Sequence, residues 1–299
     1  MKVAVIGIGS NSVRMLLAEI GDGVIRRQRR DRAGTRLFAG LDKDRRLSRE
    51  AIDRTCEAVT RMADSARADG AEVIHLFATS ATRDAANKEE FAGELQRRAG
   101  LTLEICSGEE EAVLSFLGAA EAGEAGVIDI GGGSTEVIVG DGQLIFCAFS
   151  CQMGAVRLSR LLPIRDHGDL PHVESAAAEI LREQLRAHPV LSVPENWYGT
   201  GGTFTTLAAM IRGVHWTERT FMHGTEITLE NVERVARQLA DMPVEERRLL
   251  PGLQPNRADI IVHGLCILLA CMKTLGISRI SVSEFGNLDG YMKRRYGSK

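Results

Sequence analysis

A glycine-rich motif that occurs twice decides the fold of this chain: "VIGIGSNS" at residues 5–12 and "VIDIGGGS" at residues 127–134. Aligned without gaps, the two copies share Val-Ile, Ile-Gly and the last serine, and the mismatch with the largest chemical consequence is Gly7 against Asp129. A β-rich run precedes each glycine turn and another follows it, a pattern that predicts strand, tight turn, strand. Because helical patterns follow both copies, we predict two paired α/β domains with a cleft between them.

The segments around the two copies alternate between helical and strand patterns. Helical spacing with start and stop signals is found at residues 47–71, 87–100, 108–123, 154–162, 173–187, 228–242, 255–276 and 291–296. Further strands are predicted at 72–78, with a polar loop after it, and at 101–105, 195–199 and 279–284. A stretch rich in Gly, Ala and Glu marks a boundary, so we predict domains at 1–120 and 121–299, with a C-terminal helix near 289–297 returning to the first domain.

The composition excludes several classes of protein. Of the 299 residues, 44% are hydrophobic and 26% charged, which is typical of a globular protein with a sizeable core. The net charge of −3 gives no basic field that would favour nucleic acid, and no apolar run is long enough to span a membrane. We therefore expect no nucleic-acid or membrane partner and, since the start does not resemble a signal peptide, a cytoplasmic location. The six cysteines contain no CxxC pair, and we expect them to be small buried residues rather than disulfides.

The glycine turns are candidate phosphate sites. A turn without Cβ atoms lets backbone N–H groups converge on an anion, and neighbouring hydroxyl and amide groups add further donors. A third glycine turn opens the helical pattern after residue 200, and helix N-termini also favour anions. The predicted phosphate-binding residues are Gly9, Ser10, Asn11, Ser12, Gly131, Gly132, Gly133, Ser134, Thr135, Gly201, Gly202 and Thr203.

Seven stretches together resemble the exopolyphosphatase / guanosine pentaphosphate phosphohydrolase (Ppx/GppA) family. They are "VIGIGSNSVRML", "FATSATRDAANKEEF", "SGEEEAVLSFLG", "VIDIGGGSTEVI", "SCQMGAVRL", "GTGGTFTTLAAM" and "LLPGLQPNRADIIVHGLCIL". The resemblance implies two actin-like (ribonuclease H-like) domains and the short form of the family, without an added helical domain. It also implies hydrolysis of a terminal phosphoanhydride bond in inorganic polyphosphate or guanosine pentaphosphate, with Mg²⁺, by a chain that forms a homodimer.

The same resemblance assigns catalytic roles to Glu111 and Arg83. Glu111 would activate water, although Ser107 and the three glutamates that follow Gly108 also fit a helix cap without catalytic function. Arg83 would bind phosphate, with a surface ion pair to Asp84 as the alternative.

Two carboxylates near the second glycine turn are candidate Mg²⁺ ligands. Asp129 would reach the ion directly or through water, although it could instead brace the turn. Glu136 is a second candidate ligand, or a strand residue that faces solvent. Arg36 and Arg157 also match family positions, and for both a structural ion pair is equally compatible with the sequence. The basic run at residues 26–32 is expected to be a solvated strand face along which a polyanion could lie.

The chain departs from the family pattern at three positions. Family members usually carry Asp where this chain has Gly7, Arg where it has Leu288, and Glu where it has Asp289. These losses leave two main hypotheses open, an active exopolyphosphatase with reduced activity and a degenerate sensor that binds polyphosphate or a guanosine alarmone without hydrolysis. A sugar or acetate kinase on the same fold is a third alternative.

Overall fold

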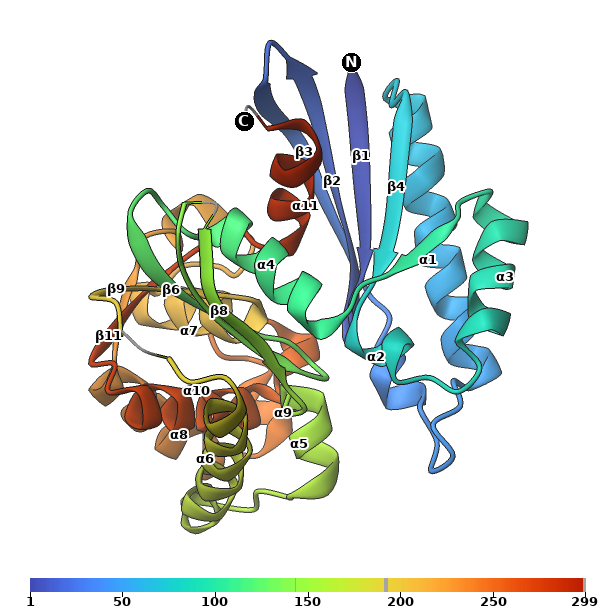
Figure 1. The fold of residues 1–299 in the computed structure, drawn as a ribbon. Helices are drawn as coiled ribbons and strands as arrows, with labels where there is room; N and C mark the ends of the chain where they lie inside the picture. The colour runs from blue at the N-terminus through green and yellow to red at the C-terminus, as the bar shows by residue number, and fades with distance from the viewer. Residues whose placement is uncertain (143, 191–192, 298–299) are drawn as a thin grey trace.

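Two mixed β-sheets, one in each half of the chain, form the centres of two lobes in the computed structural model, which describes residues 1–142, 144–190 and 193–297 (Figure 1). The first sheet has the strand order β3-β2-β1-β4-β5, and the second has the order β10-β11-β9-β6-β7-β8. The strands of the first sheet are β1 (Lys2–Ile8), β2 (Ser12–Gly21), β3 (Val24–Gly34), β4 (Val73–Ala78) and β5 (Leu103–Ile105). Those of the second are β6 (Glu124–Ile130), β7 (Thr135–Asp141), β8 (Leu144–Cys151), β9 (Asn196–Thr200), β10 (Glu226–Thr228) and β11 (Arg279–Val282).

The repeated motif forms the same hairpin in both sheets. Strands β1 and β2 pair antiparallel with Gly7 opposite Arg14, and β6 and β7 pair antiparallel with Asp129 opposite Glu136. A parallel strand then joins the other side of the first strand, β4 beside β1 and β9 beside β6. The predicted internal repeat is therefore a repeat of topology as well as of sequence, and it confirms the two-lobed α/β fold.

Helices cover both sheets. They are α1 (Arg49–Ala68), α2 (Ser80–Arg83), α3 (Lys88–Ala99), α4 (Gly108–Ala119), α5 (Ala155–Leu161), α6 (Leu170–Ala187), α7 (Gly202–Arg212), α8 (Leu229–Ala240), α9 (Val244–Arg247), α10 (Ile261–Leu275) and α11 (Asn287–Tyr296), with single 3₁₀ turns at Leu37–Gly40, His167–Asp169, Arg219–Phe221 and Pro255–Arg257. Helix α1 begins where the Ser48 hydroxyl accepts a hydrogen bond from the backbone N–H of Ala51, and its buried apolar residues pack on the first sheet. Helix α10 is apolar nearly all round because it lies inside the second lobe.

Helices α4 and α11 lie between the lobes and determine where the candidate site forms (Figure 1). Leu114 of α4 belongs to the apolar cluster that α11 forms with the first sheet, whereas Phe116 of the same helix packs against β6 and β7. The C-terminal helix α11 therefore lies against the sheet of the first lobe. Because α4 packs on α11 on one side and on the second sheet on the other, its first turn is held at the junction of the two lobes.

Three local predictions differ from the structure. The polar loop expected after β4 contains the one-turn helix α2. The helix predicted at 87–100 begins after Asn87 and ends at Gly100 in the left-handed region, but the Asn87 side chain makes no capping bond and instead accepts from the backbone N–H of Leu47 at 2.8 Å. The helix predicted from residue 255 starts at Ile261, since a 3₁₀ turn occupies Pro255–Arg257.

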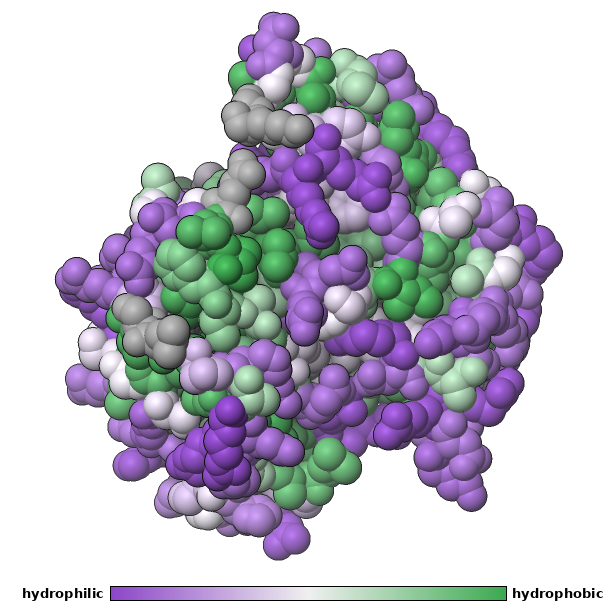
Figure 2. All heavy atoms as spheres, viewed as in Figure 1, coloured by the Kyte–Doolittle hydropathy of each residue, from purple (hydrophilic) through white to green (hydrophobic). Residues whose placement is uncertain are grey.

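The surface is mostly hydrophilic on the face drawn in Figure 2, with a hydrophobic patch over the outer end of the β7–β8 hairpin, where Leu144 and Phe146 are exposed. Within the described ranges, no helix combines the length and the apolar character needed to cross a membrane. All six cysteines lie in described segments and are free thiols, five of them buried.

Candidate active site

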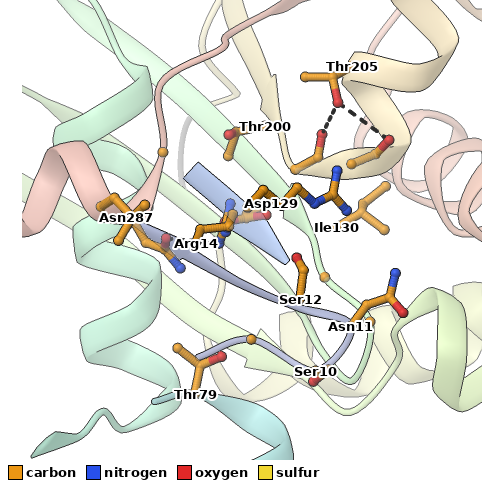
Figure 3. Close-up of a pocket in the computed structure, with 18 of the residues that line it drawn as sticks. Ser10, Asn11, Ser12, Arg14, Thr79, Asp129, Ile130, Thr200, Thr205 and Asn287 are labelled. Carbon is orange, nitrogen blue, oxygen red and sulfur yellow. Dashed lines mark hydrogen bonds between the residues drawn. The ribbon is translucent and has the colours of Figure 1, made fainter. Parts of the chain in front are cut away.

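A cleft between the lobes contains a cavity of about 240 Å³. Its walls come from the turn after β1, the turn after β6, the start of α7, the start of α11 and the first turn of α4. Figure 3 shows residues of both lobes converging on it, among them Ser10 and Ser12 from one lobe and Asp129 and Thr205 from the other.

The two glycine turns have the same internal hydrogen bond and touch each other. The N–H of Gly9 donates to the carbonyl of Ser12, and the N–H of Gly131 donates to the carbonyl of Ser134, both at 3.0 Å. A Cβ on Gly133 would lie 2.4 Å from Ser80 Oγ and 2.7 Å from Ser10 Oγ, so only glycine permits this approach. Opposed turns at this distance can bind one phosphate chain from both sides.

The third glycine turn completes the wall of the second lobe. Gly201 has φ of 96°, in the left-handed region, and a Cβ there would lie 2.8 Å from Asp129 Oδ1. A Cβ on Gly202 would coincide with the guanidinium of Arg257. Both glycines line the cleft at the start of α7, where backbone N–H groups have no partner inside the helix.

Ten of the twelve predicted phosphate-binding residues line the cleft, and Thr135 and Thr203 do not. The hydroxyl of Thr135 donates to the carbonyl of Met153 at 2.6 Å, and Thr203 packs against Gly264 of α10. Strand and helix periodicity explains both placements, because each residue follows a lining residue and its side chain points to the other side. Asn11 has both side-chain polar atoms buried without a hydrogen-bond partner and is labelled at the rim of the cavity in Figure 3.

Glu111 lies in the first turn of α4 and lines the cleft while remaining only 6% exposed. Burial, together with the charge of the nearby Asp129, raises the pKa of Glu111 to about 7 against the opposing effect of Arg83. The neighbouring Glu110 has the cap role, since it forms the capping box with Ser107. A carboxyl group that titrates near neutrality beside a polar cavity is well matched to general-base catalysis.

Arg83 faces Glu111 rather than the surface. Its Nη1 donates to the carbonyl of Cys106 at 2.9 Å and to Glu111 Oε2 at 3.3 Å, while Nη2 is buried without a partner. Arg83 is not part of the cavity wall, so it contacts the site through Glu111. The alternative ion pair with Asp84 is absent among the described contacts, because Asp84 pairs with Arg157.

Two more carboxylates lie behind the second turn. Asp129 Oδ2 accepts from Ser115 Oγ at 2.7 Å, and Glu136 Oε1 accepts from Ser150 Oγ at 2.7 Å, while Glu136 Oε2 is buried without a partner. Burial raises the pKa of Asp129, and burial together with the charges of Glu111 and Asp129 raises that of Glu136 well above its usual value. Buried like charges of this kind favour a bound cation or protonation.

The donor set suits Mg²⁺ held partly by substrate. Within residues 1–142, 144–190 and 193–297, no group of three or more His, Cys, Asp or Glu side chains forms a ready-made metal cage. Mg²⁺ commonly retains waters and binds through one or two carboxylates plus substrate phosphates, so a full cage is not required. Asp129 in the cavity wall and the unpartnered Glu136 Oε2 behind it fit that mode of binding.

Several lining residues were not predicted from the sequence, among them Arg14, Thr79, Arg257 and Asn287. Arg14 follows Ser12 by two positions on β2, so strand alternation could have placed it on the cleft side. Its Nη2 donates to Asn287 Oδ1 at 3.1 Å, and its charge lowers the pKa of Asp129 (Figure 3). Thr79 donates to Glu111, which lowers the pKa of that carboxyl. Asn287 and Arg257 come from distant segments, and no local pattern marks them.

The other arginines singled out in the sequence connect the two lobes. Arg36 pairs with Asp259, and Arg157 pairs with Asp84 and donates to the carbonyl of Gly133 at 2.6 Å. Both residues therefore make the structural ion pairs that the sequence left as an alternative.

The basic run on β3 is engaged by carboxylates rather than simply solvated. Arg27 Nε and Arg30 Nη2 donate to Asp289 Oδ1 at 2.7 and 2.6 Å, which secures β3 to α11. Burial raises the pKa of Asp289, but the two arginines outweigh that effect and hold it below its usual range. Arg30 and Arg32 still line the cleft, where they add positive charge.

The fold and the cleft define a two-lobed actin-like protein whose interlobe cavity is lined by three glycine turns. Comparison with known proteins identifies its family, because residues 16–297 match the Ppx/GppA phosphatase family. The chain belongs to that family.

Relatives with known names and structures agree with this assignment. Exopolyphosphatase 2 of Mycobacterium tuberculosis is 34% identical over 314 residues, covering 97% of both chains. The crystal structure of an exopolyphosphatase-like protein aligns with a TM-score of 0.89 and 28% identity over 99% of this chain and 97% of that one. The Aquifex aeolicus member of the Ppx/GppA family aligns with a TM-score of 0.82 and 27% identity over 99% and 97%.

Proposed function

We propose that this protein hydrolyses the terminal phosphoanhydride bond of inorganic polyphosphate and releases orthophosphate. The observation that carries the proposal is Glu111, a buried carboxyl group with a pKa of about 7 that lines the same cavity as both glycine turns. The name of the relative from Mycobacterium tuberculosis, exopolyphosphatase 2, supports the choice of substrate. We also infer that the two predicted domains, residues 1–120 and 121–299, hold this substrate between them, with α11 of the second packed on the first.

The proposed reaction needs a held phosphate chain, an oriented water and neutralised charge. The turns at residues 9–12 and 131–134 bind the chain through backbone N–H groups and hydroxyls. The water oxygen forms a bond to the terminal phosphorus, and the bond from that phosphorus to the bridging oxygen breaks. Glu111 accepts the proton of the water, and the shortened chain leaves as the other product.

Positive charge around the cleft supports this chemistry. Arg83 holds the Glu111 carboxyl group and keeps part of its population ionised, and Arg14 reaches the cavity from the first lobe. Asp129 and Glu136 would hold Mg²⁺, which, when bound, neutralises charge on the phosphate oxygens.

Guanosine pentaphosphate is a second candidate substrate, favoured by an aromatic residue in the cavity wall. Trp216 lines the same cavity as Thr217 and Arg257. An aromatic ring can stack on a base and a guanidinium can hold a phosphate, so we propose that the cavity accepts a nucleoside at Trp216. Phosphate release from guanosine pentaphosphate by wild type and by Trp216→Ala, compared on polyphosphate, tests this: we expect a selective loss on the nucleotide, and an equal loss on both substrates would contradict it.

A sensor that binds without hydrolysis is the competing function, favoured by the absence of a carboxylate at Gly7. Colorimetric phosphate release from long polyphosphate, with Mg²⁺ or with EDTA, separates the two. We expect release in Mg²⁺ that falls by about 10²-fold or more in Glu111→Gln. Glu109→Gln is the matched control, because Glu109 lies on the exposed side of the same helical turn and should keep the wild-type rate. No release by wild type above the level of Glu111→Gln would favour the sensor.

A further inference from the structure

The register of the two hairpins allows the cleft-facing residues of the lobes to be compared position by position. In the second lobe, Asp129 pairs with Glu136 on one side and with Thr200 on the other. In the first lobe, Gly7 occupies the place of Asp129 and pairs with Arg14 and Phe77. Directly opposed residues point to the same face of a sheet. The row Glu136-Asp129-Thr200 is therefore polar throughout, and the row Arg14-Gly7-Phe77 has no oxygen ligand.

The space beside Gly7 is filled by apolar groups. A Cβ on Gly7 would lie 3.0 Å from Leu288 Cδ2 and 3.1 Å from Phe77 Cζ. Phe77 is fully buried and stacks on Tyr291, with ring centroids 5.0 Å apart and planes 5° apart. Leu288 is 4% exposed and belongs to the same cluster as Phe77 and Tyr291. We call Leu288 and Phe77, which pack over Gly7, together with Tyr291, which stacks on Phe77, the apolar plug.

The apolar plug also separates Gly7 from the cleft. Leu288 and Asn287 line the cavity at the start of α11, whereas Gly7 does not. A side chain longer than hydrogen at position 7 would have to displace Leu288 before it reached the cavity. The two unusual residues, Gly7 and Leu288, are thus one packing unit.

We propose that the row of Gly7 in the first sheet supplies no cation ligand, that Leu288 seated on Gly7 excludes one from that position, and that a divalent cation is held by the carboxylates of the second lobe. The role of the cation rests on the proposed function. The packing of Gly7 against Leu288 does not.

A thermal-unfolding cycle tests the coupling between these two residues. We expect Gly7→Ala to lower Tm by roughly 3–6 °C through overpacking. The same change made in a Leu288→Ala background, where the space is open, should lower Tm much less, so the double variant is more stable than the sum of the single changes predicts. Additive shifts would overturn the packing unit. Gly21→Ala is the control, because no heavy atom lies within 4 Å of a Cβ there.

Binding of Mn²⁺ to the protein without substrate, followed by electron paramagnetic resonance, tests the one-lobe cation site. We expect Asp129→Asn to weaken Mn²⁺ binding by about 10-fold or more, and Gly7→Asp to leave it unchanged while lowering Tm. Tighter Mn²⁺ binding in Gly7→Asp without loss of Tm, or unchanged binding in Asp129→Asn, would overturn the inference. Neither measurement needs turnover, so a protein that shows these signatures but releases no phosphate refutes the proposed function and leaves this inference standing.

Discussion

The turn after β1 and the turn after β6 have the same internal hydrogen bond, but the side chains that flank them have opposite charges. Both close with a hydrogen bond of 3.0 Å, Gly9 N–H to Ser12 carbonyl and Gly131 N–H to Ser134 carbonyl, and both line the cleft. The side chain that reaches the cavity next to the first turn is a guanidinium, Arg14, whereas next to the second it is a carboxylate, Asp129. The fold therefore repeats the glycine turn, while the charge that each lobe presents to the cavity next to its turn is set by single residues on the flanking strands.

The largest expected effect on phosphate release comes from the second lobe, at Asp129. Asp129→Asn should lower phosphate release from polyphosphate by about 10²-fold or more, because it removes the carboxylate best placed to hold Mg²⁺. Phosphate release titrated with Mg²⁺ is the measurement. Asp141→Asn, an exposed carboxylate at the end of β7, should behave as wild type. Equal activity in the two variants would show that the lobes do not differ as described.

In the first lobe, Arg14→Gln should lower kcat/KM for polyphosphate by about 10-fold, since it removes a charged donor from the cavity. We expect the loss mainly in KM for polyphosphate, measured by initial rates over a range of substrate concentrations. Arg26→Gln, an exposed arginine of the same sheet, is the control. A loss confined to kcat would mean that Arg14 acts on the chemical step instead.

The pH dependence of kcat/KM tests the role of Glu111, which lies between the lobes. Glu111 must be ionised to accept a proton, so kcat/KM should fall as pH drops below about 7, the pKa to which burial raises this carboxyl group. Arg83 opposes that rise, and its replacement in Arg83→Gln should therefore move the acid limb to higher pH, with Arg83→Lys restoring it in part. An acid limb near the ordinary value of 4.5, or one that moves to lower pH in Arg83→Gln, would contradict this role.

The smallest expected effect is on stability without Mg²⁺ or substrate. The folded pKa of Glu111 is raised from 4.5 to about 7, so the folded protein binds more protons than the unfolded chain between these values. Its contribution to the free energy of unfolding is complete below pH 4.5 and is lost as pH rises through 7. Tm in EDTA should therefore fall with rising pH across this window in wild type, and less so in Glu111→Gln. Identical slopes would show that Glu111 is not the group that titrates.

The sequence was informative where the chemistry is local. The repeated turn predicted two lobes, and the hydrogen-bonding and glycine requirements of a turn lie within a few consecutive residues, as at Gly9–Ser12. The carboxylates of α4 and β6 were found because each belongs to a recognisable motif. The cap role of Glu110 and the cleft position of Glu111 follow from helix periodicity once the start of α4 is fixed at Ser107.

The sequence did not predict the contacts between segments that are far apart along the chain. Asn287 and Arg257 reach the cavity from elements more than a hundred residues beyond the second turn, and no local spacing predicts that contact. The significance of Gly7 also required the structure. The missing carboxylate is visible in the sequence, but the side chains that fill its place, Phe77 and Leu288, come from β4 and α11.

The central claim is that the cleft binds a phosphate chain and that Glu111 activates the water that cleaves it. Binding and turnover measured on the same preparation of Glu111→Gln test both parts at once, with polyphosphate titrated by calorimetry and orthophosphate release followed in parallel. We expect a Kd within about threefold of wild type and a release rate at least about 10²-fold lower. If Glu111→Gln binds polyphosphate as tightly as wild type and still releases orthophosphate at the wild-type rate, Glu111 does not activate the water.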